Sequence, residues 1–343
     1  MEKIFDGLPG ALLPWYYANH RDLPWRKDKD PYHIWLSEIM LQQTRVEAVR
    51  GYYARFLSAL PTIADLANAE DELLHKLWEG LGYYSRVRNL KKAANIIIHE
   101  HNGVFPRDYE KVRSLPGIGP YTSGAICSIA FDQPTPAVDG NVLRVIARLT
   151  DDDTPADTPQ YRRQVETQLS AVYPTEAGDF TQALMELGAT LCGPNREPNC
   201  QNCPCRSFCK GQYRATELPK RTPKRPRKEE ARTVFIVSCG GRIALTKRPD
   251  KGLLAGLWQF PDIAGNLSGQ NAIDRAGELG FQVSNLLFEV EKTHIFTHIV
   301  WKMRGIYLEA SAVCSGYEWL TPEEIHRHAA LPTAYRQFFD EIE

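Results

Sequence analysis

A short basic segment divides the sequence into two parts with different hydrophobic periodicity. Residues 218–230 read LPKRTPKRPRKEE, which is rich in proline and positive charge and has almost no apolar residue. This composition is typical of a linker. Apolar residues recur every three or four positions before it, whereas short β-branched runs between glycine-rich turns follow it. The sequence predicts a mainly α-helical domain at residues 1–215, a linker at 216–231 and an α+β domain at 232–343.

The periodicity also predicts individual elements. One long helix is expected over Ile34–Phe56, with Trp35 and Ile39 on its apolar stripe and Glu38 on the opposite side. Gly240-Gly241 between two β-branched runs predicts a hairpin. Further helices are expected over Ile63–Trp78, Val87–His99, Tyr109–Ser114, Tyr121–Ala130, Val142–Leu149, Tyr161–Val172, Gly178–Leu187, Asn271–Leu279 and Pro322–His328, and strands over Thr233–Ser238, Arg242–Thr246, Gln282–Phe288, Thr293–Phe296 and Ile299–Tyr307.

The overall charge gives no support to a nucleic-acid partner. Lys and Arg total 41 and Asp and Glu total 42, so the net charge is −1. Positive charge is instead local, because six Lys and Arg residues lie within the linker. We interpret the linker as a solvated tether, with a DNA-contacting arm as the alternative.

The sequence predicts a reducing compartment and no membrane. Residues 1–10 carry Glu2 and Asp6 and lack the apolar stretch of a signal peptide. No apolar run approaches the ~20 residues that span a bilayer. Most of the eight cysteines crowd into one stretch, which favours a metal site over disulfides. We therefore expect a cytoplasmic monomer, associated with the nucleoid if the source is bacterial.

Four cysteines have the spacing C-x7-C-x2-C-x5-C. Four thiolates suit either zinc or an iron–sulfur cluster. Zinc sites commonly use two C-x2-C pairs, and this stretch has only one such pair, which favours a [4Fe–4S] cluster. Cys205 is a fifth cysteine inside the loop and is left out as a ligand, because it would require an x1 pair; its exchange for one of the four is the alternative. The predicted ligands are Cys192, Cys200, Cys203 and Cys209, in the loop 192–209.

A glycine-rich turn between two expected helices suggests a phosphate-binding element. Residues 114–125 read SLPGIGPYTSGA, which places Gly117 and Gly119 on either side of one apolar residue. Backbone N–H groups of such a turn, together with the N-terminus of the next helix, bind phosphate. This is the pattern of a helix–hairpin–helix element, and the alternative is an ordinary packing corner.

Two carboxylates are candidates for acid–base chemistry. Asp139 precedes a helix, where it is either a helix cap or a carboxylate whose pKa is lowered by the helix dipole. Glu38 lies among apolar residues, which would raise its pKa. A protonated Glu with an ionised Asp is the pair that breaks glycosidic bonds. Spacing alone leaves a surface Glu and a cap Asp as the default interpretation.

Together these segments resemble the MutY family of adenine DNA glycosylases, within the endonuclease III-like helix–hairpin–helix superfamily. The resemblance rests on SEIMLQQTRV (37–46), EGLGYYSRVRNL (79–90), LPGIGPYTSGAI (115–126), VDGNVLRVIAR (138–148), the cysteine loop, RDLPWRKDKDPYHIWLSE (21–38), GLWQFP (256–261) and HIFTH (294–298). It implies a [4Fe–4S] cluster and a C-terminal domain that is MutT-like, or Nudix-like.

The resemblance also implies a function and a set of roles. The function is base excision repair, in which adenine paired with 8-oxoguanine, or with guanine, is flipped out of duplex DNA and hydrolysed. Glu38 would be the general acid, and Asp139 would stabilise the cationic sugar or add to it. The remaining residues are implied as follows: Tyr121 and Asn141 hold the acidic groups, Leu23, Trp25 and Arg26 form the adenine pocket, Gln43 and Tyr83 fill the emptied stack, and Thr297 and His298 inspect 8-oxoguanine.

Three positions depart from the family pattern. The first cysteine gap is x7, where x6 is usual, and one extra loop residue is easily absorbed. Thr297 stands where Ser is usual and keeps the hydroxyl. Gln182 stands where relatives often have an acidic residue, so that contact differs.

Three rival functions are weighed against this one. An endonuclease III-like lyase needs a Lys after the hairpin for a Schiff base, and Tyr121 stands there instead, which favours a monofunctional glycosylase. A nucleotide pyrophosphatase needs paired acids in an R-E-x2-E-E helix, which residues 272–279 lack. A catalytically inactive DNA-binding module is disfavoured because Glu38 and Asp139 are both present.

Overall fold

The computed structural model describes the chain except residues 1, 224–225 and 343. Contacts between Cα atoms group the chain into two compact units: Met1–Asn68 with Asn89–Pro223, and Ala69–Arg88 with Lys224–Glu343. Lys224 and Arg225 of the predicted linker lie outside the described residues. No described helix has the length and apolar character required to cross a membrane.

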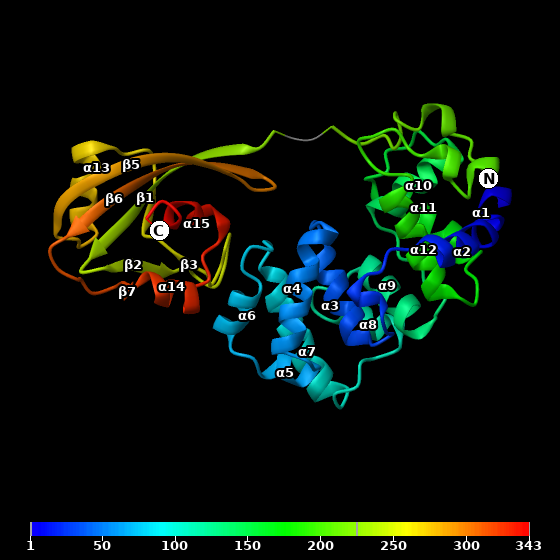
Figure 1. The fold of residues 1–343 in the computed structure, drawn as a ribbon, viewed down its shortest axis with the longest axis horizontal. Coiled ribbons are helices and arrows are strands. Elements are labelled where there is room, and N and C mark those ends of the chain that lie inside the picture. Colours follow the sequence, from blue (N-terminus) through cyan, green and yellow to red (C-terminus); the bar gives the residue numbers. More distant parts are fainter. Residues whose placement is uncertain (1, 224–225, 343) are drawn as a thin grey trace. The chain divides into compact units, whose positions relative to one another are not determined.

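The first unit is helical (Figure 1). Its central helix α12 packs against α2, α9 and α10. The buried apolar faces of α2, α10 and α12 form one core. The elements are α1 (Glu2–Asp6), α2 (Leu8–Asn19), η1 (Pro24–Arg26), α3 (Pro31–Leu41), α4 (Val46–Ala59), α5 (Ile63–Asn68), α7 (Ser85–Glu100), whose first turn lies in the other unit, α8 (Tyr109–Ser114), α9 (Pro120–Phe131), α10 (Gly140–Thr150), α11 (Pro159–Ser170), α12 (Ala177–Thr190), and the short turns η2 (Cys200–Asn202), η3 (Arg206–Phe208) and η4 (Gln212–Arg214).

The long helix predicted over Ile34–Phe56 is wrong. The chain leaves helical geometry between α3 and α4, and Gln43 adopts a left-handed backbone with φ of 58°. Helix α3 is also buried nearly all round, so Glu38 does not lie on a solvent face. No local signal indicates this break, because neither Gly nor Pro lies between the two helices. The helix predicted over Ile63–Trp78 likewise ends at Asn68 and restarts at Asp71.

The second unit contains a mixed sheet. In the described residues seven strands pair in the order β3-β2-β1-β6-β5, with β4 on β1 and β7 on β2; β1 and β6 are parallel and the other pairs are antiparallel. The strands are β1 (Lys228–Cys239), β2 (Arg242–Lys247), β3 (Trp258–Gln259), β4 (Asp262–Ala264), β5 (Val283–Ile295), β6 (Ile299–Ala310) and β7 (Glu318–Leu320), and the helices are α6 (Asp71–Leu77), α13 (Gly269–Glu278), α14 (Pro322–His328) and α15 (Thr333–Phe339).

Alternation along β1 produces two cores, one on each face of the sheet. Val234 and Ile236 share one core with residues of α14 and α15, and Phe235 and Val237 share the other core with residues of α13. This is the expected consequence of side chains that alternate across a strand. The hairpin predicted at Gly240-Gly241 is confirmed, with both glycines at positive φ. The two strands predicted within 282–296 form the single strand β5.

Residues 69–88 pack with the C-terminal part of the chain. The backbone N–H of Leu331 donates to Glu79 Oε1 at 3.0 Å, and Arg88 Nη1 donates to the carbonyl of Ala255 at 2.7 Å. This grouping joins segments more than 130 positions apart, and no local pattern in the sequence indicates it.

Candidate active site

A cleft of about 620 Å³ in the first unit brings together most of the predicted catalytic residues. Its walls come from η1, α3, α9 and α12, from the turn after α3, and from the segment before α10. The predicted residues that line it are Leu23, Trp25, Arg26, Glu38, Gln43, Gly119, Tyr121, Asp139 and Asn141. These residues are spread over more than a hundred positions, so the fold, not sequence proximity, assembles them.

Glu38 is a buried carboxyl group with one neutral partner. The Tyr121 hydroxyl donates to Glu38 Oε2 at 2.5 Å, and the side chain has no ion pair among the described residues. Burial raises the pKa of Glu38 to about 7; the bond from Tyr121 and the charge of Arg26 act downward, and the charge of Asp139 acts upward. Burial also keeps the pKa of Tyr121 well above its ordinary value, so this phenol remains a donor. Glu38 can therefore carry a transferable proton near neutral pH.

Asp139 is the N-cap of α10. Its Oδ1 accepts the backbone N–H of Val142 at 2.8 Å, and its Oδ2 accepts Asn141 Nδ2 at 2.7 Å. Burial raises the pKa of Asp139 and outweighs the opposing hydrogen bonds from Val142 and Asn141. The net direction is thus opposite to the lowering predicted from the helix N-terminus. The cap and catalytic interpretations are compatible, because Asp139 both caps α10 and lines the cleft.

The predicted adenine-pocket segment forms one wall of the cleft. Leu23 and Trp25 are buried, and Arg26 is mostly covered. Gln182 of α12, one of the expected departures from the family pattern, lines the same cleft. Side-chain amide groups offer both a donor and an acceptor to a purine edge.

Sequence reasoning missed Glu186, which is fully buried and also lines the cleft. Its carboxylate pairs with Arg21 and Arg26. Burial acts to raise the pKa of Glu186, but hydrogen bonds from Arg21 and the charge of Arg26 together hold that pKa at about 2. An acidic residue within the otherwise apolar run ALMELGA was the available signal.

The predicted helix–hairpin–helix turn has the expected geometry. It connects α8 to α9, and Gly117 has φ of 79°, which favours glycine. A Cβ at Gly117 would also lie 2.8 Å from the side chain of Asn89. Gly119 is the N-cap of α9, and Tyr121, the partner of Glu38, lies in the first turn of this helix. The hairpin and the partner of Glu38 therefore belong to one helix.

The two residues predicted to fill the emptied stack share an unusual backbone. Gln43 and Tyr83 both have positive φ, at 58° and 47°, and both side chains are exposed. A left-handed backbone costs energy for residues other than Gly and is concentrated at functional positions. Within the second unit, the Tyr83 hydroxyl lies 2.7 Å from Thr297 Oγ1. Thr297 and the neighbouring His298 are exposed between β5 and β6.

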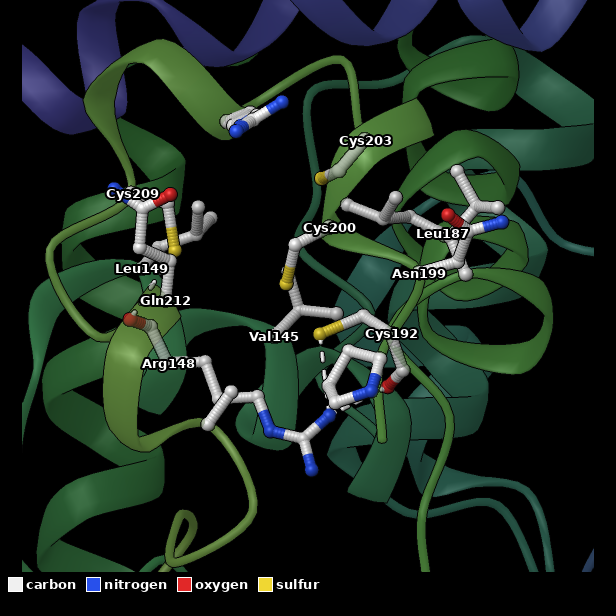
Figure 2. A pocket seen from close by; sticks show the side chains of 14 residues that line it. Val145, Arg148, Leu149, Leu187, Cys192, Asn199, Cys200, Cys203, Cys209 and Gln212 are labelled. Atoms are coloured by element: carbon white, nitrogen blue, oxygen red, sulfur yellow. Dashed lines mark hydrogen bonds between the residues drawn. The ribbon is translucent and has the colours of Figure 1, made fainter. Parts of the chain in front are cut away.

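The four predicted ligand cysteines line a separate small cavity in the first unit (Figure 2). Their Sγ atoms are turned toward one shared space, and all four thiols are free of disulfides. Cys205 does not line this cavity and is buried in the apolar core. No described group of three or more ligands is close enough to hold a single metal ion. Four thiols that line one cavity are a donor set that can hold an iron–sulfur cluster, in which each thiolate binds a different iron.

Two buried arginines of α10, which the sequence analysis did not single out, connect the segment at Cys192 with Asn141 in the cleft. Arg144 donates to Asn141 Oδ1 at 2.8 Å and to the carbonyl of Cys192 at 2.9 Å. Arg148 lies 3.3 Å from Cys192 Sγ and donates to the carbonyl of Gly193 at 3.0 Å. Asn141 is therefore fixed by Arg144 while it donates to Asp139.

Two family matches cover most of the chain. Residues 36–171 match the HhH-GPD superfamily of base excision DNA repair proteins, and residues 233–341 match the NUDIX domain. Among solved structures, that of a thermostable thymine-DNA glycosylase is similar over 62% of this chain and 97% of its own, with a TM-score of 0.56 and 27% identity.

Curated relatives are similar over nearly the whole chain. The adenine DNA glycosylase of Rattus norvegicus is 38% identical over 397 aligned residues, covering 96% of this chain and 76% of the relative. The adenine DNA glycosylase of Homo sapiens is 36% identical over 401 residues, covering 96% and 73% respectively.

Proposed function

The chain belongs to the adenine DNA glycosylases of base excision repair, and from this premise we propose that it removes adenine paired with 8-oxoguanine, or with guanine, in duplex DNA. The observation that carries the proposal is the buried pair of Glu38 and Tyr121, joined at 2.5 Å, beside Asp139 in one cleft. This arrangement provides an acid near neutral pH next to a second carboxylate, which hydrolysis of an N-glycosidic bond requires.

Glu38 is the general acid in this proposal. Tyr121 occupies Glu38 Oε2, which leaves Oε1 to carry the proton toward a ring nitrogen of the departing adenine. Protonation of the leaving group lowers the barrier to breaking the bond to the sugar. Because the pKa of Glu38 is about 7, excision slows as the pH rises through that value.

Asp139 stabilises the positive charge that develops on the sugar, by proximity or by transient covalent addition before water attacks. The bonds from Val142 and Asn141 hold its two oxygens in fixed directions. Burial raises its pKa, and these bonds favour the charged form that stabilisation of a cation requires.

The target base is extruded from the duplex before reaction. Leu23, Trp25, Arg26 and Gln182 line the pocket that receives it. Gln43 and Tyr83 occupy the space left in the stack, and their strained backbone holds each side chain in an exposed position. Backbone N–H groups at Gly117 and Gly119 bind a phosphate, which fixes the strand in register.

Recognition of 8-oxoguanine is assigned to the loop between β5 and β6. Oxidation converts N7 of guanine from an acceptor to a donor, and the hydroxyl of Thr297 can accept from it. His298 is exposed next to it and adds a second polar group. The proximity of Tyr83 and Thr297 supports a shared role in inspecting that base.

We assign a [4Fe–4S] cluster to Cys192, Cys200, Cys203 and Cys209, whose thiols line one cavity. When bound, the cluster supplies iron–thiolate bonds that tie together the loop 192–209. Visible absorbance together with iron and sulfide analysis tests the assignment. Zinc alone in the purified protein would contradict it.

The remaining proposed properties follow from the activity. The partner is double-stranded DNA, the active species is a monomer, and the location is the cytoplasm, at the nucleoid in a bacterium. A lyase is disfavoured because Tyr121, bound to Glu38, replaces the amine nucleophile. Nucleotide hydrolysis is disfavoured because α13 lacks paired acids.

The test is a glycosylase assay on a duplex with adenine opposite 8-oxoguanine. Duplexes with adenine opposite guanine and with thymine glycol are the comparisons, and borohydride trapping reports Schiff-base formation. We expect adenine release from the first two duplexes and little trapped complex. Release of thymine glycol with efficient trapping would contradict the proposal.

A further inference from the structure

Glu186 has an arrangement that the roles assigned above do not explain. It is fully buried at the cleft, yet both of its oxygens are already occupied. Oε1 accepts the backbone N–H and Nε of Arg21 at 3.1 and 2.7 Å, and Oε2 accepts Arg21 Nη2 and Arg26 Nη2 at 2.9 and 2.8 Å. A carboxylate with four hydrogen bonds has no good acceptor site left for a base. Glu186 must therefore act through the two arginines.

The two arginines form a linked pair in the base pocket. Arg26 Nη1 donates to the carbonyl of Arg21 at 3.1 Å, and its guanidinium lies 5.6 Å from the ring centre of Tyr16. Both arginines line the cleft. A guanidinium has five N–H donors, so the hydrogen bonds with Glu186 leave others for a purine ring nitrogen. Without Glu186, the guanidinium groups of Arg21 and Arg26 would lose the hydrogen bonds to this carboxylate that fix their direction.

Charge gives Glu186 a second effect. The ion pairs of Arg21 and Arg26 within the described residues are both with this carboxylate. The groups that act on Glu38 are Tyr121 from α9, Asp139 at the start of α10 and Arg26 from η1. Arg26 is the cation among them and favours the ionised form of Glu38. A cation near a general acid lowers the pKa of that acid, so fewer molecules carry the proton that the reaction needs.

We propose that Glu186 is a positioning residue for adenine excision, which fixes Arg21 and Arg26 as donors in the base pocket and offsets their charge beside Glu38. This inference rests on the proposed function. Glu186 of α12 would then influence both the geometry of the base pocket and the protonation of Glu38 on α3.

The test is the pH dependence of single-turnover adenine excision opposite 8-oxoguanine. Glu186→Gln leaves the charge of the two arginines unbalanced, so the alkaline limb of the pH–rate profile should shift to lower pH by about one unit. The excision rate above neutral pH should then be at least roughly tenfold lower than that of the wild type. Glu186→Asp keeps the charge but shortens the reach, so its rate falls while its limb stays near that of the wild type.

Removal of Arg26 supplies the matched control. Arg26→Gln alone should move the limb to higher pH than in the wild type, because the cation that acts on Glu38 is gone. In the double variant Arg26→Gln, Glu186→Gln, the alkaline limb should lie at higher pH than in Glu186→Gln alone. These shifts identify a charge effect, which a structural role for Glu186 would not produce.

The outcomes separate this inference from the proposed function. Wild-type protein that releases no adenine would overturn both. Adenine release with limbs of Glu186→Gln and Arg26→Gln that coincide with the wild type would overturn only the role of Glu186. If Glu186→Gln does not fold, Arg26→Gln carries the test, and an unmoved limb in that variant overturns the inference.

Discussion

Two buried carboxylates, Glu38 of the helical unit and Asp262 of the sheet-containing unit, have opposite kinds of hydrogen-bond partner. In the helical unit, Glu38 has one neutral hydrogen-bond partner, and burial raises its pKa to about 7. In the sheet-containing unit, the side chain of Asp262 is also largely inaccessible but has several partners: an ion pair with Arg232, the Tyr335 hydroxyl at 2.9 Å and Gln259 Nε2 at 3.1 Å. Burial alone therefore does not mark a catalytic carboxylate. The feature that supports the acid role proposed for Glu38 is burial without an ion pair.

The largest expected effect tests the uncompensated acid. Glu38→Gln keeps the shape of the side chain but removes the transferable proton, so adenine release should fall by at least roughly 10³-fold while binding to the mismatched duplex is retained. Single-turnover excision and binding to the same duplex measure the two properties. Glu110→Gln, an exposed change on α8, is the matched control. Turnover retained by Glu38→Gln would refute the acid role.

The compensated carboxylate should show the reverse behaviour. Asp262→Asn leaves the mostly covered side chain of Arg232 without its ion-pair partner, so the free energy of unfolding should fall by roughly 3 kcal/mol, the lower end of the range for a broken buried pair. Excision of adenine opposite guanine by the folded protein should change little. Denaturant unfolding followed by circular dichroism measures the loss. A free energy of unfolding equal to that of the wild type would contradict the contrast between Glu38 and Asp262.

Stability should also depend on pH through Glu38. Its pKa is raised from 4.5 to about 7 in the folded state, so the stabilisation from protonation is present below pH 4.5 and is lost as the pH rises through 7. The shift corresponds to an upper limit of roughly 3 kcal/mol. Glu38→Gln removes this dependence and should be more stable than the wild type at alkaline pH. Unfolding curves of both proteins that change in parallel with pH would contradict the raised pKa.

The smallest expected effect lies in the second unit. Thr297→Ala removes one hydroxyl and its contact with Tyr83, so the preference for 8-oxoguanine over guanine opposite adenine should fall by about three- to tenfold. Relative excision rates on the two duplexes measure it. Thr293→Ala, an exposed change on β5, should leave the preference unchanged. An equal loss of rate on both duplexes would indicate that Thr297 does not discriminate between the bases.

Local patterns predicted much of the fold. The helices around Asp139 and Tyr121 are confirmed within a few residues, and so is the hairpin at Gly240-Gly241. The break after α3 was missed, because Gln43 carries no local sign of its left-handed backbone. Packing of α3 on all sides also overrode the solvent face that its residues suggested.

The sequence by itself determined the residue types of the chemistry: two carboxylates, a glycine hairpin and four cysteines at ligand-like spacing. Only the tertiary structure decided how each would behave. The raised pKa of Glu38, the saturated bonds of Glu186 and the packing of residues 69–88 with the C-terminal segment depend on neighbours distant in sequence. The physical reason is that residue type and spacing are local properties, whereas desolvation and charge pairing depend on everything that packs around a group.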